Sequence, residues 1–179
     1  MGQEVMITIR QMTQDDDDAV CRISAACYRF AAQVHDFTAQ EVTTALHEHC
    51  RPDHIASLRV SGNALVAESA GQVAGVIVTR GNSIQVLFVD PTLHRKGVGR
   101  ALFRRAEEKI ATAGRSMVTL KTRPSAIPFY LAMGMECTGH WHPQNGAFAG
   151  MQMTVLEKQL RPQPSDGANA AHGAPRSSS

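Results

Sequence analysis

The spacing of apolar residues changes along the chain, and the most informative change lies in its middle. Residues 84–89 are a run of apolar, β-branched and aromatic side chains, too short for a buried helix and stopped by a proline, which predicts a buried strand. Over residues 98–110 the apolar positions fall at helical spacing between charged ones, which predicts an amphipathic helix. A loop that contains Gly97 and Gly99 joins the two.

The same two kinds of pattern, short apolar runs and apolar residues at helical spacing, predict the other strands and helices. Further strands are expected at residues 5–10, 64–69, 73–79, 117–121, 135–141 and 151–158. Further helices are expected at residues 20–31 and 125–133. Another should begin with the capping box at residues 38–41 and end at residues 51–52. The helix over residues 98–110 connects the strand at 84–89 to the strand at 117–121. Such a crossover is right-handed, and the two strands should pair in parallel. The fold class is therefore α/β with a mixed sheet of the α+β kind, flanked by about four helices.

Length and composition bound the domain organisation. A chain of 179 residues with 43% hydrophobic residues fits a single domain, predicted here over residues 1–160. From Arg161 onward Pro, Ser, Gly and Ala replace apolar residues, so residues 161–179 are predicted to be a disordered tail. The acidic run at residues 15–18 is interpreted as the solvated first turn of a helix rather than a metal site.

Charge and segment lengths narrow the class of protein. A formal net charge of +2 without a long basic run gives no electrostatic case for a nucleic-acid partner. The sequence shows neither a segment long enough to span a membrane nor a signal peptide, so no membrane partner and a cytoplasmic location are expected. The four cysteines lack a Cys-x-x-Cys spacing and are expected to be reduced. His47 with Cys50 gives only two ligands, so no metal is predicted.

The loop before the central helix has the properties of an anion site. Backbone N–H groups at a helix start attract phosphate, and glycines allow close approach of a ligand. Arg95, Lys96 and Arg100 add positive charge around the same turn. The spacing fits neither a dinucleotide fingerprint nor a P-loop.

Two motifs resemble a known family. His94-Arg95-Lys96-Gly97-Val98-Gly99, after Val89-Asp90-Pro91, resembles the pyrophosphate loop of the GNAT superfamily of acetyl-CoA-dependent N-acetyltransferases, which reads Gln/Arg-x-x-Gly-x-Gly/Ala. Residues 123–135 resemble the family's later motif, Asn-x-x-Ala-x-x-Phe-Tyr-x-x-x-Gly-Phe, with Ala126, Phe129, Tyr130 and Gly134 in register. His94, Arg123 and Met135 depart from the family's residues.

The resemblance implies a fold, a cosubstrate and a site. The sheet would be mostly antiparallel, with its parallel pair splayed around acetyl-CoA. The backbone of Phe88 and Val89 would hold the pantetheine and polarise the thioester carbonyl. The amides of the loop would hold the pyrophosphate, which assigns cofactor-binding roles to Arg95, Lys96, Gly97, Val98, Gly99 and Arg100. Tyr130 matches the family's acid, which protonates the departing thiolate.

The acceptor and the base are less defined. The leading hypothesis is acetylation of a primary amine on a small molecule by direct attack. The alternatives are acetylation of a protein or aminoacyl-tRNA amine, and a non-catalytic acyl-CoA sensor or scaffold. Residues 84–89 contain no carboxylate, which leaves a water relay or the candidates His35, Asp36 and Glu41 as the base. His140 and His142 share a strand face as candidate acceptor contacts, and a homodimer is left open.

Overall fold

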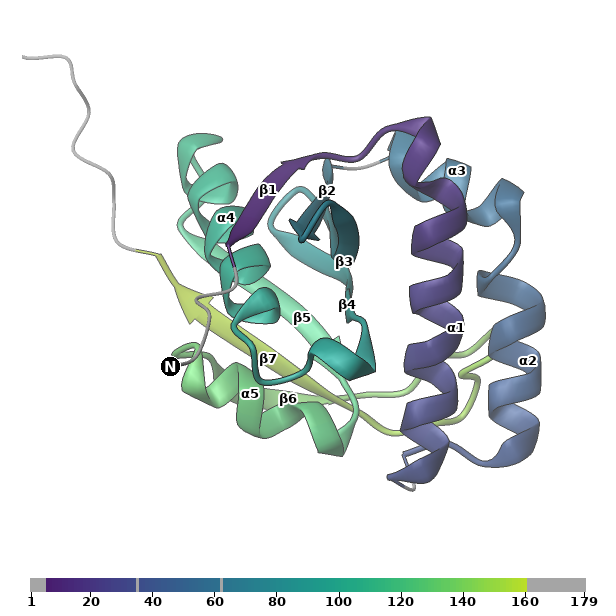
Figure 1. Cartoon of the computed structure of the whole chain (residues 1–179). Helices are drawn as coiled ribbons and strands as arrows, with labels where there is room; N and C mark the ends of the chain where they lie inside the picture. The colour runs from purple at the N-terminus through teal and green to yellow at the C-terminus, as the bar shows by residue number, and fades with distance from the viewer. Residues whose placement is uncertain (1–5, 35, 62, 161–179) are drawn as a thin grey trace, which may run out of the picture.

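The computed structural model describes residues 6–34, 36–61 and 63–160 of the chain. Its seven strands form one sheet in the order β1-β2-β3-β4-β5-β7-β6 (Figure 1). The strands are β1 (Ile7–Gln11), β2 (Asn63–Ser69), β3 (Gln72–Arg80), β4 (Ser83–Val89), β5 (Met117–Thr122), β6 (Glu136–Trp141) and β7 (Met153–Gln159). The α-helices are α1 (Asp17–Gln33), α2 (Ala39–His49), α3 (Pro52–Ser61), α4 (Val98–Thr112) and α5 (Ile127–Ala132). The predicted tail at 161–179 lies outside the described residues.

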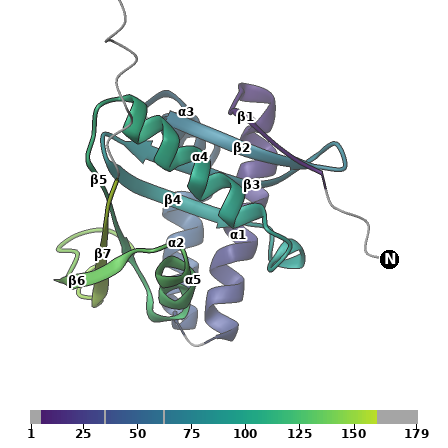
Figure 2. The same cartoon turned by 90° about the vertical axis from the view of Figure 1, so that its left-hand side faces the viewer.

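The sheet is mixed, as predicted. β4 and β5 are parallel, and the other neighbouring strands are antiparallel. The parallel pair is short, because only Ser83 with Thr119 and Ile84 with Leu120 are in register. Beyond Ile84 the two strands part, so the sheet splits into a β1–β4 half and a β5–β7 half with a gap between them (Figure 2).

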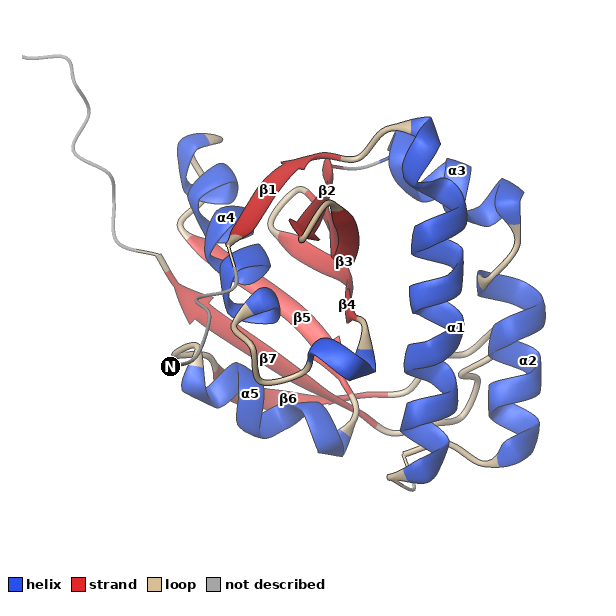
Figure 3. Ribbon diagram, in the orientation of Figure 1, coloured by secondary structure: helices blue, strands red, loops and turns tan. Residues whose placement is uncertain are grey.

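Helices cover both faces of the β1–β4 half. α4 packs on one face and α1 with α3 on the other, as Figure 3 shows in ribbon form. The α4 side holds the main core, in which Leu102, Phe103 and Ile77 are fully buried. The α1 and α3 side holds a second core around Val20 and Ile55. The sheet is thus the middle layer of three, as expected for a sheet with apolar side chains on both faces.

Helix α3 was not predicted from the sequence. Pro52 was interpreted as the end of the preceding helix, and it is also the first residue of a new one. Proline is tolerated there because the first N–H groups of a helix have no intrahelical acceptor. Over residues 52–60 of α3 only Ile55 is fully buried, and Val60 is 78% exposed, so the apolar stripe is too short to signal a helix.

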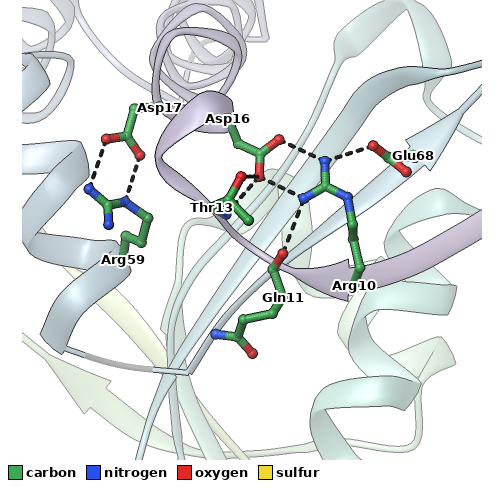
Figure 4. Close-up of polar contacts among 7 residues, drawn as sticks. All are labelled: Arg10, Gln11, Thr13, Asp16, Asp17, Arg59 and Glu68. Atoms are coloured by element: carbon green, nitrogen blue, oxygen red, sulfur yellow. Dashed lines mark hydrogen bonds and ion pairs between the residues drawn. The ribbon is translucent and has the colours of Figure 1, made fainter.

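The acidic run at the start of α1 is not a simple solvated turn. Asp16 is only 4% exposed and accepts two hydrogen bonds from the Arg10 guanidinium, at 2.7 and 2.8 Å (Figure 4). Arg10 also contacts Glu68 on β2 at 2.7 Å. Asp17 pairs with Arg59 of α3 at 3.0 Å. These contacts tie β1, β2 and α3 to the start of α1, which corrects the interpretation of Asp16 and Asp17.

In the described ranges, no helix has both the length and the apolar composition that a membrane crossing needs.

Candidate acetyl-CoA site

The gap between β4 and β5 is lined by backbone groups of β4. The N–H of Asp90 donates to the carbonyl of Ala74, on the β3 side, at 2.9 Å. Successive residues of a strand direct their backbone N–H and C=O groups to opposite edges. The backbone groups of Phe88, two residues before Asp90, therefore point toward β3, and those of Leu87 and Val89 point toward the gap. The ladder therefore places Leu87, rather than the predicted Phe88, beside Val89 at the gap.

The carbonyl oxygen of Val89 has two neighbours that the sequence did not suggest. The thiol of Cys27 on α1 donates to it at 3.2 Å. The Nε2 atom of His94 lies 3.0 Å from the same oxygen and must carry the proton, since a carbonyl only accepts. The His94 ring also meets the ring of Phe30 edge-on, with centroids 5.1 Å apart. Burial raises the pKa of Cys27 to about 12, so this side chain is a neutral donor.

The loop that follows β4 is curled by two left-handed residues. Arg95 has φ 63° and Gly97 has φ 88°. The N–H of Lys96 is engaged, since it donates to the carbonyl of Leu93 at 3.4 Å. In α4 the N–H of Ala101 bonds to Gly97 at 3.0 Å. The three residues before Ala101 start the helix, and their amides precede any intrahelical acceptor, which is the arrangement that binds phosphate groups.

The side chains around the loop are of two kinds, exposed cations and one buried valine. Arg95, Lys96 and Arg100 are exposed and place three positive charges around the helix start. Val98 is 1% exposed and anchors the helix in the core, so only its backbone can meet a ligand. The loop therefore combines free amides with surrounding cations, which are the features from which an anion site is predicted.

Tyr130 lies in the core beside the gap. It is 7% exposed, and its ring centroid is 5.0 Å from that of Phe129 and 6.1 Å from that of Phe103. Burial raises the pKa of the Tyr130 phenol, which keeps it protonated at neutral pH. Its acid role stays a prediction, and the structure gives this tyrosine a packing role as well.

Of the base candidates, Asp36 and Glu41 are both engaged. The Asp36 carboxylate accepts from the hydroxyl and the N–H of Ser125. Glu41 closes a capping box at the start of α2, where it accepts from the N–H of Thr38 at 2.7 Å. His35 lies outside the described residues.

A different polar pair lies between α1 and α2. The hydroxyl of Tyr28 is 3.0 Å from Nδ1 of His49. The Tyr28 ring meets the ring of Phe88 on β4 edge-on, with centroids 5.3 Å apart. Burial lowers the pKa of His49 and raises that of Tyr28, so both are neutral at pH 7. Nothing in the local sequence marks this pair, because its members are 21 positions apart.

The remaining candidates lie at the edge of the sheet, where β6 is the last strand. His140 is exposed on the edge strand β6, and His142 is exposed just after it. Over the described residues, no three His, Cys, Asp or Glu side chains gather into a group that could hold a metal ion.

The parting of β4 from β5 before the start of α4 agrees with the arrangement that the resemblance to the GNAT superfamily implies. Residues 33–158 match the family described as Acetyltransferase (GNAT) domain. The match covers more than half of the chain, so this protein belongs to the GNAT acetyltransferase family.

Solved structures share the fold at low sequence identity. A GCN5-related N-acetyltransferase from Rhodopseudomonas palustris aligns with a TM-score of 0.81 at 17% identity, over 89% of this chain and 99% of that one. The PaiA N-acetyltransferase of Thermoplasma acidophilum, solved with coenzyme A, gives 0.67 at 15%, over 87% and 99%. YncA of Salmonella typhimurium, solved with acetyl-CoA, gives 0.58 at 21%, over 90% and 98%.

Proposed function

We propose that the protein transfers the acetyl group of acetyl-CoA to a primary amine of a small-molecule acceptor by direct attack, in the cytoplasm. The observation that carries this proposal is the parting of β4 from β5 just before the loop at residues 94–100. It provides free strand backbone for a pantetheine arm and helix-start amides for a pyrophosphate, in the order in which acetyl-CoA presents them.

Residues of the gap and the loop would hold acetyl-CoA. The amides of Gly97, Val98, Gly99 and Arg100 suit the pyrophosphate, with the side chains of Arg95, Lys96 and Arg100 as counter-charges. The backbone of Leu87 and Val89 suits the pantetheine amides and the thioester oxygen. To use the carbonyl of Val89, a pantetheine N–H takes the place that the hydrogen bond from His94 occupies here.

The chemistry needs an acid and a base from this chain. Acetyl-CoA supplies an acyl group activated as a thioester. The neutral amine attacks the carbonyl carbon, the C–S bond breaks, the Tyr130 hydroxyl gives its proton to the departing sulfur, and the proton that the attacking nitrogen loses as the amide forms returns to the Tyr130 oxygen. Backbone N–H groups at the gap stabilise the oxyanion that forms on attack.

For the base we propose the pair of Tyr28 and His49. β4 carries no carboxylate, and Asp36 and Glu41 are engaged elsewhere. The acceptor ammonium passes its proton to the Tyr28 oxygen while the Tyr28 proton moves to Nδ1 of His49. His54, whose ring centroid is 5.1 Å from that of His49, and Glu48 are the other titratable groups beside this imidazole.

The test is release of free thiol from acetyl-CoA in the presence of a panel of primary amines, with product mass as a second readout. The proposal expects amine-dependent thiol release and a product 42 Da heavier than the amine, about the mass that replacing N–H by N-acetyl adds. Binding of acetyl-CoA without amine-dependent release would instead favour the sensor function, which the missing β4 carboxylate supports.

A further inference from the structure

Four aromatic rings from four separate segments meet on one side of β4. We call Tyr28, Phe37, Phe88 and Phe148 the aromatic cluster. Tyr28 lies on α1, Phe37 precedes α2, Phe88 lies on β4 and Phe148 lies between β6 and β7. The ring centroids of Tyr28 and Phe88 are 5.3 Å apart, and those of Phe37 and Phe148 are 5.5 Å apart.

The aromatic cluster borders the gap on the side away from α4. Phe88 stands between the two β4 residues whose backbone faces the gap. On the β5 side, the guanidinium carbon of Arg123 lies 4.9 Å from the centroid of the Phe37 ring. The α4 side of the gap is filled by buried residues such as Leu102 and Phe103. The aromatic cluster therefore forms the wall of the gap opposite α4.

The acidic residues around the aromatic cluster are engaged in local contacts. Asp36 accepts from the N–H and hydroxyl of Ser125, and Glu41 belongs to the capping box of α2. Glu48 accepts from the N–H of Ala147 at 2.8 Å, which fixes the loop that carries Phe148. These contacts hold the walls of the aromatic cluster together.

A cationic side chain, Arg123, lies beside the aromatic cluster. Arg123 is half-buried and donates to the backbone carbonyl of Asp36. Its Nε atom is buried without a hydrogen-bond partner, and within the described ranges Arg123 forms no ion pair. A second cationic group on an acceptor would meet this guanidinium with like charge, whereas a flat apolar group would find rings to pack against.

We propose that the acceptor is a primary amine attached to an aromatic group, with no second cation. This inference rests on the acetyl transfer proposed above and adds the chemical class of the amine. The rings supply edge and face contacts for the aromatic group, and the Tyr28 hydroxyl at their border meets the amine. Like-charge repulsion from Arg123 would weaken the binding of polyamines and aminoglycosides.

The experiment compares kcat/KM for four amines with acetyl-CoA held at saturation. Phenethylamine carries the aromatic group, propylamine lacks it, and spermidine and kanamycin carry several cations. The inference expects phenethylamine to exceed each of the other three by at least about tenfold, the lower end of what a well-formed apolar pocket discriminates. Equal or higher values for spermidine, kanamycin or propylamine overturn it.

Two variants test whether the aromatic cluster causes the preference for phenethylamine. Phe148→Leu keeps apolar volume in the loop and removes the ring, so the ratio of kcat/KM for phenethylamine over propylamine should fall several-fold with the KM for acetyl-CoA unchanged. Trp141→Ala, on β6 and 39% exposed, is the matched aromatic control and should keep the ratio. An unchanged ratio in Phe148→Leu, or an equal fall in Trp141→Ala, contradicts the assignment.

Failure of this inference is separable from failure of the proposed function. If acetyl-CoA does not bind, the proposed function fails and the inference fails with it. If acetyl-CoA binds and the polycations are the amines acetylated, acetyl transfer stands and the aromatic class is wrong. Binding with no turnover of phenethylamine at millimolar concentration also overturns the aromatic class.

Discussion

Gly99 at the start of α4 packs directly against the ring of Phe129 on α5. A methyl group on Gly99 would lie 3.4 Å from two carbons of that ring and 3.5 Å from a methyl of Val89. The loop after β4 and the Phe-Tyr pair of α5, about thirty positions apart, are thus in contact across the gap. The small residue at position 99 thus lets the two motifs meet.

Replacing Gly99 tests this contact. Gly99→Leu should displace Phe129 or the start of α4, so acetyl-CoA binding should weaken at least about fivefold, which corresponds to the lower end of the roughly 1–3 kcal/mol that overpacking costs. The measurement is titration calorimetry. Gly99→Ala is the matched control, because its methyl group reaches ordinary contact distance, and it should bind within about threefold of the wild type. Wild-type affinity in Gly99→Leu would show that the contact is not required.

Replacing Tyr130 by Phe tests its role as the acid. The ring is kept, so the core around Phe103 should hold, while turnover should fall about 10²-fold because the departing thiolate loses its proton donor. Pre-steady-state thiol release gives the rate, and the Kd for acetyl-CoA is the control that should not move. Unchanged turnover would leave Tyr130 with packing alone.

The strand, loop and helix at residues 84–110 were predictable because their signals are local. Apolar runs, a proline stop and glycines at the turn lie within one stretch, and the structure places β4, the loop and α4 there. Helix α3 was missed, since a proline usually signals the end of a helix, whereas α2 ends at His49 and Pro52 begins the next helix. The ion pair of Asp16 with Arg10 was missed because a run of aspartates looks solvated unless the partner on β1 is known.

Contacts between segments far apart in the chain could not be predicted from the sequence. Phe148 meets Tyr28 from 120 positions away, with ring centroids 6.1 Å apart. His49 became a base candidate only through its hydrogen bond to Tyr28. The candidates chosen from the sequence, Asp36 and Glu41, were plausible by residue type, but side-chain partners decide whether a carboxylate is free, and those partners come from the folded chain.

The pH dependence of turnover tests His49. Burial lowers the pKa of its imidazole, so the side chain stays neutral to lower pH than an ordinary histidine and accepts a proton over that range. In the wild type, kcat/KM should stay level as pH falls through about 6.5 and drop only below it. His49→Gln should be slower by about tenfold or more at pH 7 and lack this acid limb. His47→Gln, exposed on the same helix, is the control. A profile in His49→Gln that matches the wild type would remove His49 from the mechanism.

The pair of Arg10 and Asp16 should contribute to stability at neutral pH. Hydrogen bonds from Arg10 lower the pKa of the buried Asp16 carboxyl below its ordinary value. A depressed pKa stabilises the fold above the unfolded-state pKa, near 3.9, and that contribution is lost as pH falls through the lower folded-state value. Asp16→Asn should therefore cost about 2 kcal/mol at pH 7, and less below about pH 4. Urea denaturation across pH measures this difference. Asp15→Asn, exposed, should change stability by no more than about 0.5 kcal/mol, and an equal loss in both variants would refute the role of the pair.

Binding of acetyl-CoA is the most direct test of the whole account, measured as the thermal stability of the protein with and without it. At about 100 times its Kd, acetyl-CoA should add roughly 2.7 kcal/mol to the free energy of unfolding. Gly97→Glu should lose this gain, because the side chain would set a negative charge at the pyrophosphate. Gly97→Ala is the control for strain at φ 88° and should lower the starting melting temperature while it keeps most of the gain. A wild-type protein whose melting temperature does not change at millimolar acetyl-CoA would contradict the account.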